Sequence, residues 1–157
     1  MPMKVLGIDP GTQTMGFGIV ERVEDTLSHI DSGVIKFKNR DLQESIKLIP
    51  SLLDEVTREY QIDTISMETL FFAINPKSVI KLAQFRGALL AYFLDRFDRV
   101  EEFSPLEIKK SITGNGRSSK QIVNQKVREI LNIETEIRPL DISDALAVAI
   151  TYLKIHQ

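Results

Sequence analysis

The order of strands and helices is the feature that most restricts how this chain can fold. Five stretches have the apolar or alternating pattern of β-strands, at 4–8, 15–23, 27–36, 62–68 and 99–103. The first three follow one another directly as a β-meander, whereas the last two alternate with helical segments. This order is typical of a mixed sheet covered by helices on both faces. We therefore expect an α/β fold with a mixed five-stranded sheet.

Four helices are predicted around that sheet. The first follows Asp41, which has the spacing of a capping box with Glu44, and Pro50 should kink or break it. The others are predicted at 77–94, 119–132 and 140–154. The chain shows no internal repeat, low-complexity tract or linker, and 157 residues suit one ordinary domain. We expect a single domain over 1–157.

Composition excludes several classes of protein. With no cysteine, the chain has no disulfide, thiolate zinc site or cysteine nucleophile. No apolar run approaches the roughly 18 residues that span a bilayer. The N-terminus, which enters a strand at once, does not have the layout of a signal peptide. We expect a cytoplasmic protein.

Charge is distributed unevenly, although the net charge is only −2. The stretch 108–128 has six basic residues and no acid, and the stretch 70–94 has three basic residues and no acid. A near-neutral protein with two acid-free stretches can present one positive face to nucleic acid. The basic residues that we expect on this face are Lys77, Lys81, Arg86, Lys109, Lys110, Arg117, Lys120 and Arg128.

Four acids stand where ligand chemistry is expected. Asp9 and Glu68 each end a predicted strand, and sheets of this kind bind ligands at strand ends. Asp141 and Asp144 are three residues apart, so on a helix they share one face. Three of the acids also have a simpler interpretation when taken singly: an acceptor of bonds from turn amides for Asp9, a solvent-facing side chain for Glu68 and a helix cap for Asp141. These interpretations explain single acids, but they do not explain why four acids stand at such positions in one chain.

Four carboxylates without a neighbouring histidine or cysteine suit a hard cation, magnesium or manganese, rather than zinc. Pairs of such ions, about 4 Å apart, support phosphodiester cleavage. His29 and His156 show no spacing to a partner ligand, and we interpret both as structural or surface residues. The acids therefore predict a metal-dependent reaction at phosphate.

With these residues in place, the chain resembles the RuvC family of bacterial Holliday-junction resolvases over nearly its whole length. Four motifs carry the resemblance: Leu6-Gly7-Ile8-Asp9-Pro10-Gly11-Thr12 with Gly16-Phe17-Gly18; Glu68 with Phe71-Phe72, Asn75, Ser78, Leu82, Gln84, Arg86 and Gly87; Thr113-Gly114-Asn115-Gly116 with Lys120; and Asp141 and Asp144 with Ala145-Leu146-Ala147. The resemblance implies a ribonuclease-H-like fold and a homodimer that nicks opposed strands of a four-way DNA junction in recombination and repair.

The resemblance also implies roles for individual residues. Asp9, Glu68, Asp141 and Asp144 would be the catalytic acids that bind two Mg²⁺ ions, for which Mn²⁺ would substitute. Lys109 and Lys120 match the family's DNA-binding lysines, and Phe71 matches its junction-contacting aromatic residue. Of Phe71 and Phe72, we expect one to pack in the core and the other to meet unstacked bases. A branch-migration complex of the RuvA and RuvB type would be a further partner.

The predicted helix 77–94 is apolar on more than one face. One interpretation is a core helix buried within a monomer, and the other is a helix that a partner subunit covers on one side. We prefer the second, because a two-fold dimer matches the two-fold symmetry of a four-way junction.

Three rival functions remain open at this point. Gly7-Ile8-Asp9-Pro10-Gly11-Thr12 also resembles the phosphate loop of actin-like and sugar-kinase ATPases, but that class needs a second, similar domain. A shorter RuvC-like group associated with ribosomal RNA processing would cleave RNA and ignore four-way DNA. A non-catalytic DNA-binding dimer would not need all four acids.

Overall fold

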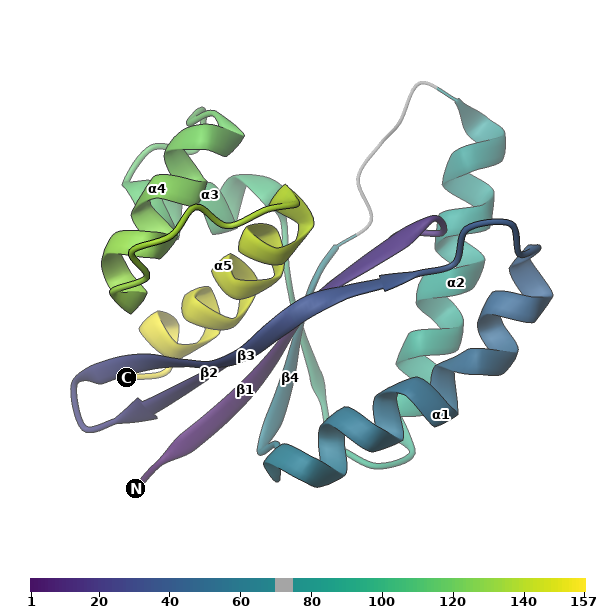
Figure 1. Ribbon diagram of the computed structural model, residues 1–157, viewed down its shortest axis with the longest axis horizontal. Helices are drawn as coiled ribbons and strands as arrows, with labels where there is room; N and C mark the ends of the chain where they lie inside the picture. Colours follow the sequence, from purple (N-terminus) through teal and green to yellow (C-terminus); the bar gives the residue numbers. More distant parts are fainter. Residues whose placement is uncertain (70–74) are drawn as a thin grey trace.

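The computed structural model of the protein describes residues 1–69 and 75–157 (Figure 1). Its single sheet has the strand order β3-β2-β1-β4-β5. The strands are β1 (Met3–Asp9), β2 (Thr14–Val23), β3 (Thr26–Lys36), β4 (Thr64–Glu68) and β5 (Val100–Phe103). Strands β1, β2 and β3 pair antiparallel, whereas β4 runs parallel to β1 and β5 runs parallel to β4. The predicted mixed five-stranded sheet is confirmed.

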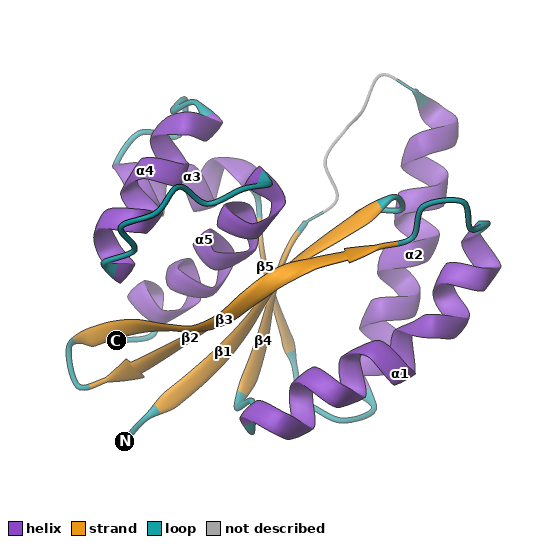
Figure 2. Ribbon diagram, viewed as in Figure 1, coloured by secondary structure: helices purple, strands orange, loops and turns teal. Residues whose placement is uncertain are grey.

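Helices cover both faces of the sheet, as Figure 2 shows. One face packs against α1 (Leu42–Tyr60) and α2 (Pro76–Leu94), and the other packs against α3 (Pro105–Thr113), α4 (Lys120–Leu131) and α5 (Leu140–Ile155). Alternation along the strands divides the core, because successive side chains point to opposite faces. In β1, for example, Val5 joins the core beside α5, whereas Leu6 and Ile8 join the core beside α1 and α2.

Helix α1 begins as the sequence predicts. The Asp41 side chain accepts a hydrogen bond of 2.8 Å from the amide of Glu44, which is one half of the predicted capping box, and Ile49 and Leu53 are buried. The helix continues through Pro50 without a break, and Figure 1 shows it bent partway along its length. Proline lacks the amide hydrogen and crowds the preceding turn, so a bend is the expected response.

Helix α3 was not predicted from the sequence. Ser104 and Glu107 form a capping box, with bonds of 3.1 Å from the Glu107 amide to the Ser104 hydroxyl and 3.2 Å from the Ser104 amide to the Glu107 carboxylate. Pro105 occupies the first turn, where proline is well tolerated. The local signal was therefore present, but the helix is short and buries only Ile108 and Ile112.

Helix α2 is buried on one face only. Phe85, Leu89 and Phe93 face the sheet, whereas Ile80 and Leu94 are 59% and 52% exposed. The interpretation that this helix is buried on all sides within one chain is therefore wrong. Within the described part of the chain, none of the helices is both long enough and apolar enough to cross a membrane.

Candidate metal centre and active-site pocket

A pocket of about 570 Å³ opens at the ends of β1 and β4. The register pairs Ile8 of β1 with Met67 of β4, so the next residues, Asp9 and Glu68, reach the same edge of the sheet. Both acids line the pocket, together with Asp141 and Asp144 from the first turns of α5. The four predicted acids are thus brought together from three elements, although up to 135 residues separate them along the chain.

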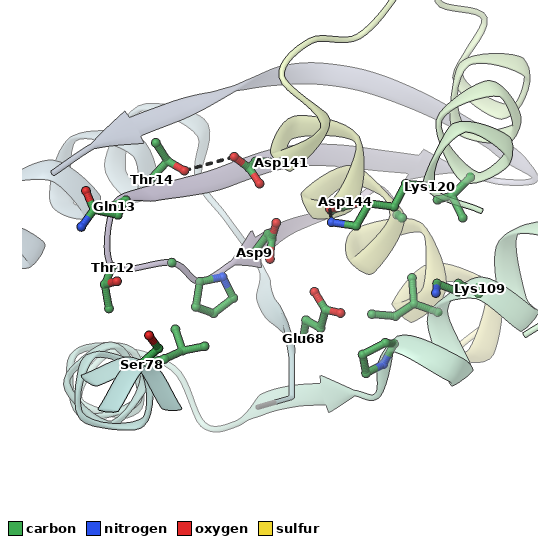
Figure 3. Close-up of a pocket in the computed structure, with 17 residues that line it drawn as sticks. Asp9, Thr12, Gln13, Thr14, Glu68, Ser78, Lys109, Lys120, Asp141 and Asp144 are labelled. Atoms are coloured by element: carbon green, nitrogen blue, oxygen red, sulfur yellow. Dashed lines mark hydrogen bonds and ion pairs between the residues drawn. The ribbon is translucent and has the colours of Figure 1, made fainter. Parts of the chain in front are cut away.

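Three of the acids are close enough to share one ion. One carboxylate oxygen from each of Asp9, Asp141 and Asp144 lies within 4.8 Å of the other two. Glu68 lies beside this group, and Figure 3 shows all four carboxylates directed into the same space. Their donor atoms are all oxygens, which is the set that hard divalent cations prefer. The chemistry of the pocket is consistent with divalent metal binding.

Glycines allow α5 to approach the sheet closely enough to place its acids. A Cβ atom on Gly7 would lie 2.1 Å from the carbonyl oxygen of Ala145, and one on Gly16 would lie 2.2 Å from that of Asp141. Both distances are far inside van der Waals contact, so only glycine permits this packing. The Ser66 hydroxyl adds a hydrogen bond of 3.1 Å to the carbonyl of Val148. Asp141 and Asp144 therefore reach Asp9 because backbone packs on backbone.

Thr14 is a residue of this site that the sequence did not indicate. Its hydroxyl, at the start of β2, donates a hydrogen bond of 3.1 Å to the Asp141 carboxylate, drawn as a dashed line in Figure 3. A hydrogen bond to one carboxylate oxygen fixes the rotamer of Asp141 and leaves the other oxygen available to a ligand. We infer that Thr14 orients Asp141.

The variant Thr14→Val tests that inference. Valine has nearly the shape of threonine but cannot donate, so Asp141 loses its orienting bond. We expect about 10-fold weaker Mn²⁺ binding, measured by isothermal titration calorimetry, at the lower end of what loss of such partners costs. Thr12→Val, in the same pocket lining, is the control and should bind Mn²⁺ normally. Equal affinity in Thr14→Val and the unmodified protein would contradict the role.

Burial and mutual repulsion disfavour the negatively charged forms of these acids when no cation is bound. Burial, followed by the negative charges of Glu68, Asp144 and Asp141, raises the pKa of Asp9 to about 9. Burial also raises the pKa of Glu68 and that of Asp144 above their ordinary values. Asp9 thus holds a proton at neutral pH when no metal is present, and bound cations would favour the charged forms of all these acids.

Two lysines bring positive charge to the pocket. Lys120 at the start of α4 forms an ion pair of 3.5 Å with Asp144, and the carboxylate raises the pKa of Lys120. Lys109 on α3 also lines the pocket, and its charge opposes the rise in the pKa of Glu68. The structure therefore places both lysines beside the acids.

The other predicted DNA-binding residues differ in where the structure places them. Lys77, Lys81, Lys110 and Arg117 are exposed, as a DNA-binding surface requires. Phe71 and Phe72 lie outside the described residues.

Arg86 is a correction to the predicted surface, and Arg128 is less exposed than the exposed lysines. Arg86 is buried and pairs with Glu102, so it does not lie on an exposed face. Arg128 is half-buried and donates to the carbonyls of Ile133 and Glu134. The two basic residues expected on α4 therefore have different surroundings: Lys120 faces the acids, whereas Arg128 contacts the segment that leads to α5.

Comparison with known proteins identifies one family over nearly the whole chain. The family model described as crossover junction endodeoxyribonuclease RuvC matches residues 5–152. The chain is 47% identical to the RuvC of Aliarcobacter butzleri over 150 residues, covering 96% of this chain and 97% of that one. It is also 47% identical to the RuvC of Helicobacter pylori strain G27, covering 98% of this chain and all of the relative.

A solved structure, that of T. thermophilus RuvC in complex with Holliday junction substrate, superposes with a TM-score of 0.88. It is 27% identical to this chain and covers 98% of this chain and 96% of its own length. The match confirms the ribonuclease-H-like fold that the resemblance implied. With the family model covering most of the sequence and close relatives covering nearly all of it, the chain belongs to the RuvC family of crossover junction endodeoxyribonucleases.

Proposed function

We propose that this chain is a structure-selective endonuclease that resolves four-way (Holliday) DNA junctions by paired hydrolytic nicks in opposed strands, in recombination and repair. The observation that carries the proposal is the convergence of Asp9, Asp141 and Asp144, with oxygens within 4.8 Å of one another and Glu68 beside them. Family membership supports the same activity. We further propose that residues 1–157 act as one nuclease domain in the cytoplasm.

We propose Mg²⁺ as the metal, two ions in each site, with Mn²⁺ as a substitute. Asp9, Glu68, Asp141 and Asp144 would hold the ions, because all four offer oxygen ligands and three of them have raised pKa values that cation binding would lower. The chemistry that paired divalent ions supply in such sites is activation of a water and stabilisation of the leaving oxygen.

The chain's own residues then bind and orient the phosphodiester. Lys120 and Lys109 approach the acids from α4 and α3, so they offer positive charge to a phosphate that enters the pocket. The exposed Lys77, Lys81, Lys110 and Arg117 would extend this contact along the DNA backbone. Phe71 and Phe72 remain our candidates for contact with unstacked bases at the junction centre.

A homodimer through α2 would pair two such sites. The exposed face of this helix has small residues in the middle and larger apolar residues at the ends: Ile80, Ala83, Gly87, Ala91 and Leu94. Small residues permit close approach of a second helix, and a Cβ on Gly87 would meet nothing within 4 Å. A two-fold axis there would match the symmetry of the junction. A branch-migration complex of the RuvA and RuvB type is the further partner we propose.

The decisive experiment compares a synthetic four-way junction with a matched linear duplex, each with Mg²⁺ and with EDTA. We expect symmetric nicks in the junction with Mg²⁺, little cleavage of the duplex, and none in EDTA. Equal cleavage of both substrates, or cleavage in EDTA, would refute the proposal. Cleavage of structured RNA in preference to the junction would favour the ribosomal RNA-processing class, and saturable ATP hydrolysis would favour the ATPase class.

Lys120→Ala should weaken junction binding and reduce its salt dependence. Each phosphate contact contributes about 0.9 to the slope of log K against log salt, so loss of one contact should lower the slope by about 1. Binding is measured by fluorescence anisotropy in EDTA at several salt concentrations. Lys126→Ala is the matched control on the same helix, because Lys126 pairs with Glu129 at 3.2 Å instead of with the site. An unchanged slope in Lys120→Ala would remove this lysine from the DNA-binding surface.

A further inference from the structure

Arg86 is a buried charged residue with an incomplete set of partners. It lies on the inner face of α2 and is 9% exposed. Its Nη2 atom donates to the Glu102 carboxylate at 2.6 Å and to the main-chain carbonyl of Glu68 at 3.1 Å. Its Nε atom is buried and has no hydrogen-bond partner among residues 1–69 and 75–157. Arg86 therefore touches the backbone of one of the four acids directly.

The two acceptors lie side by side at the ends of neighbouring strands. In the parallel register of β4 and β5, Met67 pairs with Glu102 and Glu68 pairs with Phe103. One nitrogen of Arg86 thus joins both strands at the edge where the pocket opens, next to the last ladder bond, 2.9 Å from the Thr69 amide to the Phe103 carbonyl. Strand ends fray without such contacts, because pairing stops there.

Stability alone does not account for a buried arginine at this position. Removing a guanidinium and a carboxylate from water costs several kcal/mol per ion, and a well-packed apolar residue is often as good or better for folding. The Nε atom, which lacks a partner in the described part of the chain, adds to that cost. What an apolar residue cannot do is hold the carbonyl of Glu68 and the side chain of Glu102 at fixed positions together.

We propose that Arg86 is a positioning residue for the metal centre, which it serves by fixing the backbone of Glu68 so that the Glu68 carboxylate faces the pocket. Through Glu102 it also fixes the end of β5, from which the chain enters α3 at Pro105 and reaches Lys109. This inference rests on the proposed function of the four acids as metal ligands. It assigns Arg86 a role inside the protein in place of the DNA contact expected from the sequence.

The test is direct Mn²⁺ binding, followed by isothermal titration calorimetry, together with the melting temperature of each variant. Arg86→Met keeps the length of the side chain and removes its donors, and we expect about 10-fold weaker Mn²⁺ binding, as for other residues that orient metal ligands. Arg86→Lys should recover part of the affinity, because an ammonium group can still donate to either acceptor.

Arg96→Met is the matched control. Arg96 also ties α2 to its surroundings, through Asp54 at 3.4 Å and the ring of Tyr92 at 3.9 Å, but it does not line the pocket. It should lower the melting temperature and leave Mn²⁺ affinity unchanged. Unchanged Mn²⁺ affinity in Arg86→Met would overturn the proposal, as would an equal loss of affinity in Arg96→Met.

Glu102→Ala decides the matter if Arg86→Met does not fold. It removes the carboxylate that holds Arg86 at 2.6 Å, and the Glu102 side chain is 35% exposed, so water can take its place and folding should survive. Weaker Mn²⁺ binding supports the positioning role, and normal binding refutes it. Mn²⁺ binding is measured without DNA, so the two proposals can fail independently. An unmodified protein that binds Mn²⁺ but does not cleave junctions would refute the proposed function. The role of Arg86 would still be decided by the Mn²⁺ affinities of the variants.

Discussion

We expect replacement of Asp9 with asparagine to abolish junction cleavage and to leave junction binding intact or tighter. Asp9 lies at the centre of the acid group, and its oxygen is within 4.8 Å of those of both Asp141 and Asp144. Loss of a residue that merely orients a ligand costs about 10 to 100-fold, so loss of a ligand should cost at least about 100-fold. Binding should survive, because Asp9 holds a proton at neutral pH when no metal is bound, so asparagine adds no negative charge to a surface that meets phosphates.

Cleavage is measured under single-turnover conditions with saturating Mg²⁺, and binding is measured in EDTA. Asp63→Asn is the control, since Asp63 precedes β4 at the end opposite to the pocket, where it accepts a bond of 2.8 Å from the Lys4 amide. It should cleave normally. Loss of junction binding together with cleavage in Asp9→Asn would show that Asp9 is structural.

Asp9→Asn should also change how the stability of the protein depends on pH in the absence of metal. The pKa of Asp9 is raised from 3.8 to about 9, mainly by burial. Between these values the folded state holds a proton that the unfolded state releases, so the stabilisation is complete below about 4 and is lost as pH rises through about 9. In EDTA, the melting temperature of the unmodified protein should therefore fall more steeply from pH 6 to pH 9 than that of Asp9→Asn. Parallel curves of melting temperature against pH would show that the pKa of Asp9 is not raised in the folded protein.

A charge placed on the exposed face of α2 should uncouple the two nicks. If α2 of one subunit packs against its copy, Ala91→Arg brings two like charges together across the two-fold axis, which costs several kcal/mol in an interface. We expect a monomer by analytical ultracentrifugation. On a supercoiled plasmid that extrudes a cruciform, the linear product, which requires both nicks, should fall at least about 10-fold relative to the singly nicked product.

Gln43→Arg is the control for this prediction, because it adds the same charge at an exposed position of α1. It should remain dimeric and give normal amounts of linear product. A dimer that persists in Ala91→Arg would place the interface elsewhere, and normal paired nicking by a monomer would refute the need for two joined sites.

Local pattern was enough to predict most of the fold and the four acids. The alternating strands, the cap at Asp41 and the i, i+3 spacing of Asp141 and Asp144 depend on neighbours in the sequence, and each is found where predicted. Asp9 was recognisable because a charged residue that ends an apolar strand is costly, whereas Glu68 was identified by its place at a strand end and by the family motif that follows it. Helix α3 had a readable capping box as well, but few apolar residues followed it.

Long-range packing determined the remaining features of the site. The bond from Thr14 to Asp141 joins residues 127 positions apart, and that from Arg86 to Glu68 joins a helix to the end of a strand beneath it. Nothing in the sequence near Arg86 distinguishes a buried arginine from an exposed one, because its burial depends on where α2 crosses β4 and β5. The sequence therefore determines which groups can bind metal, whereas the packing of helices on the sheet determines which other residues hold those groups in place.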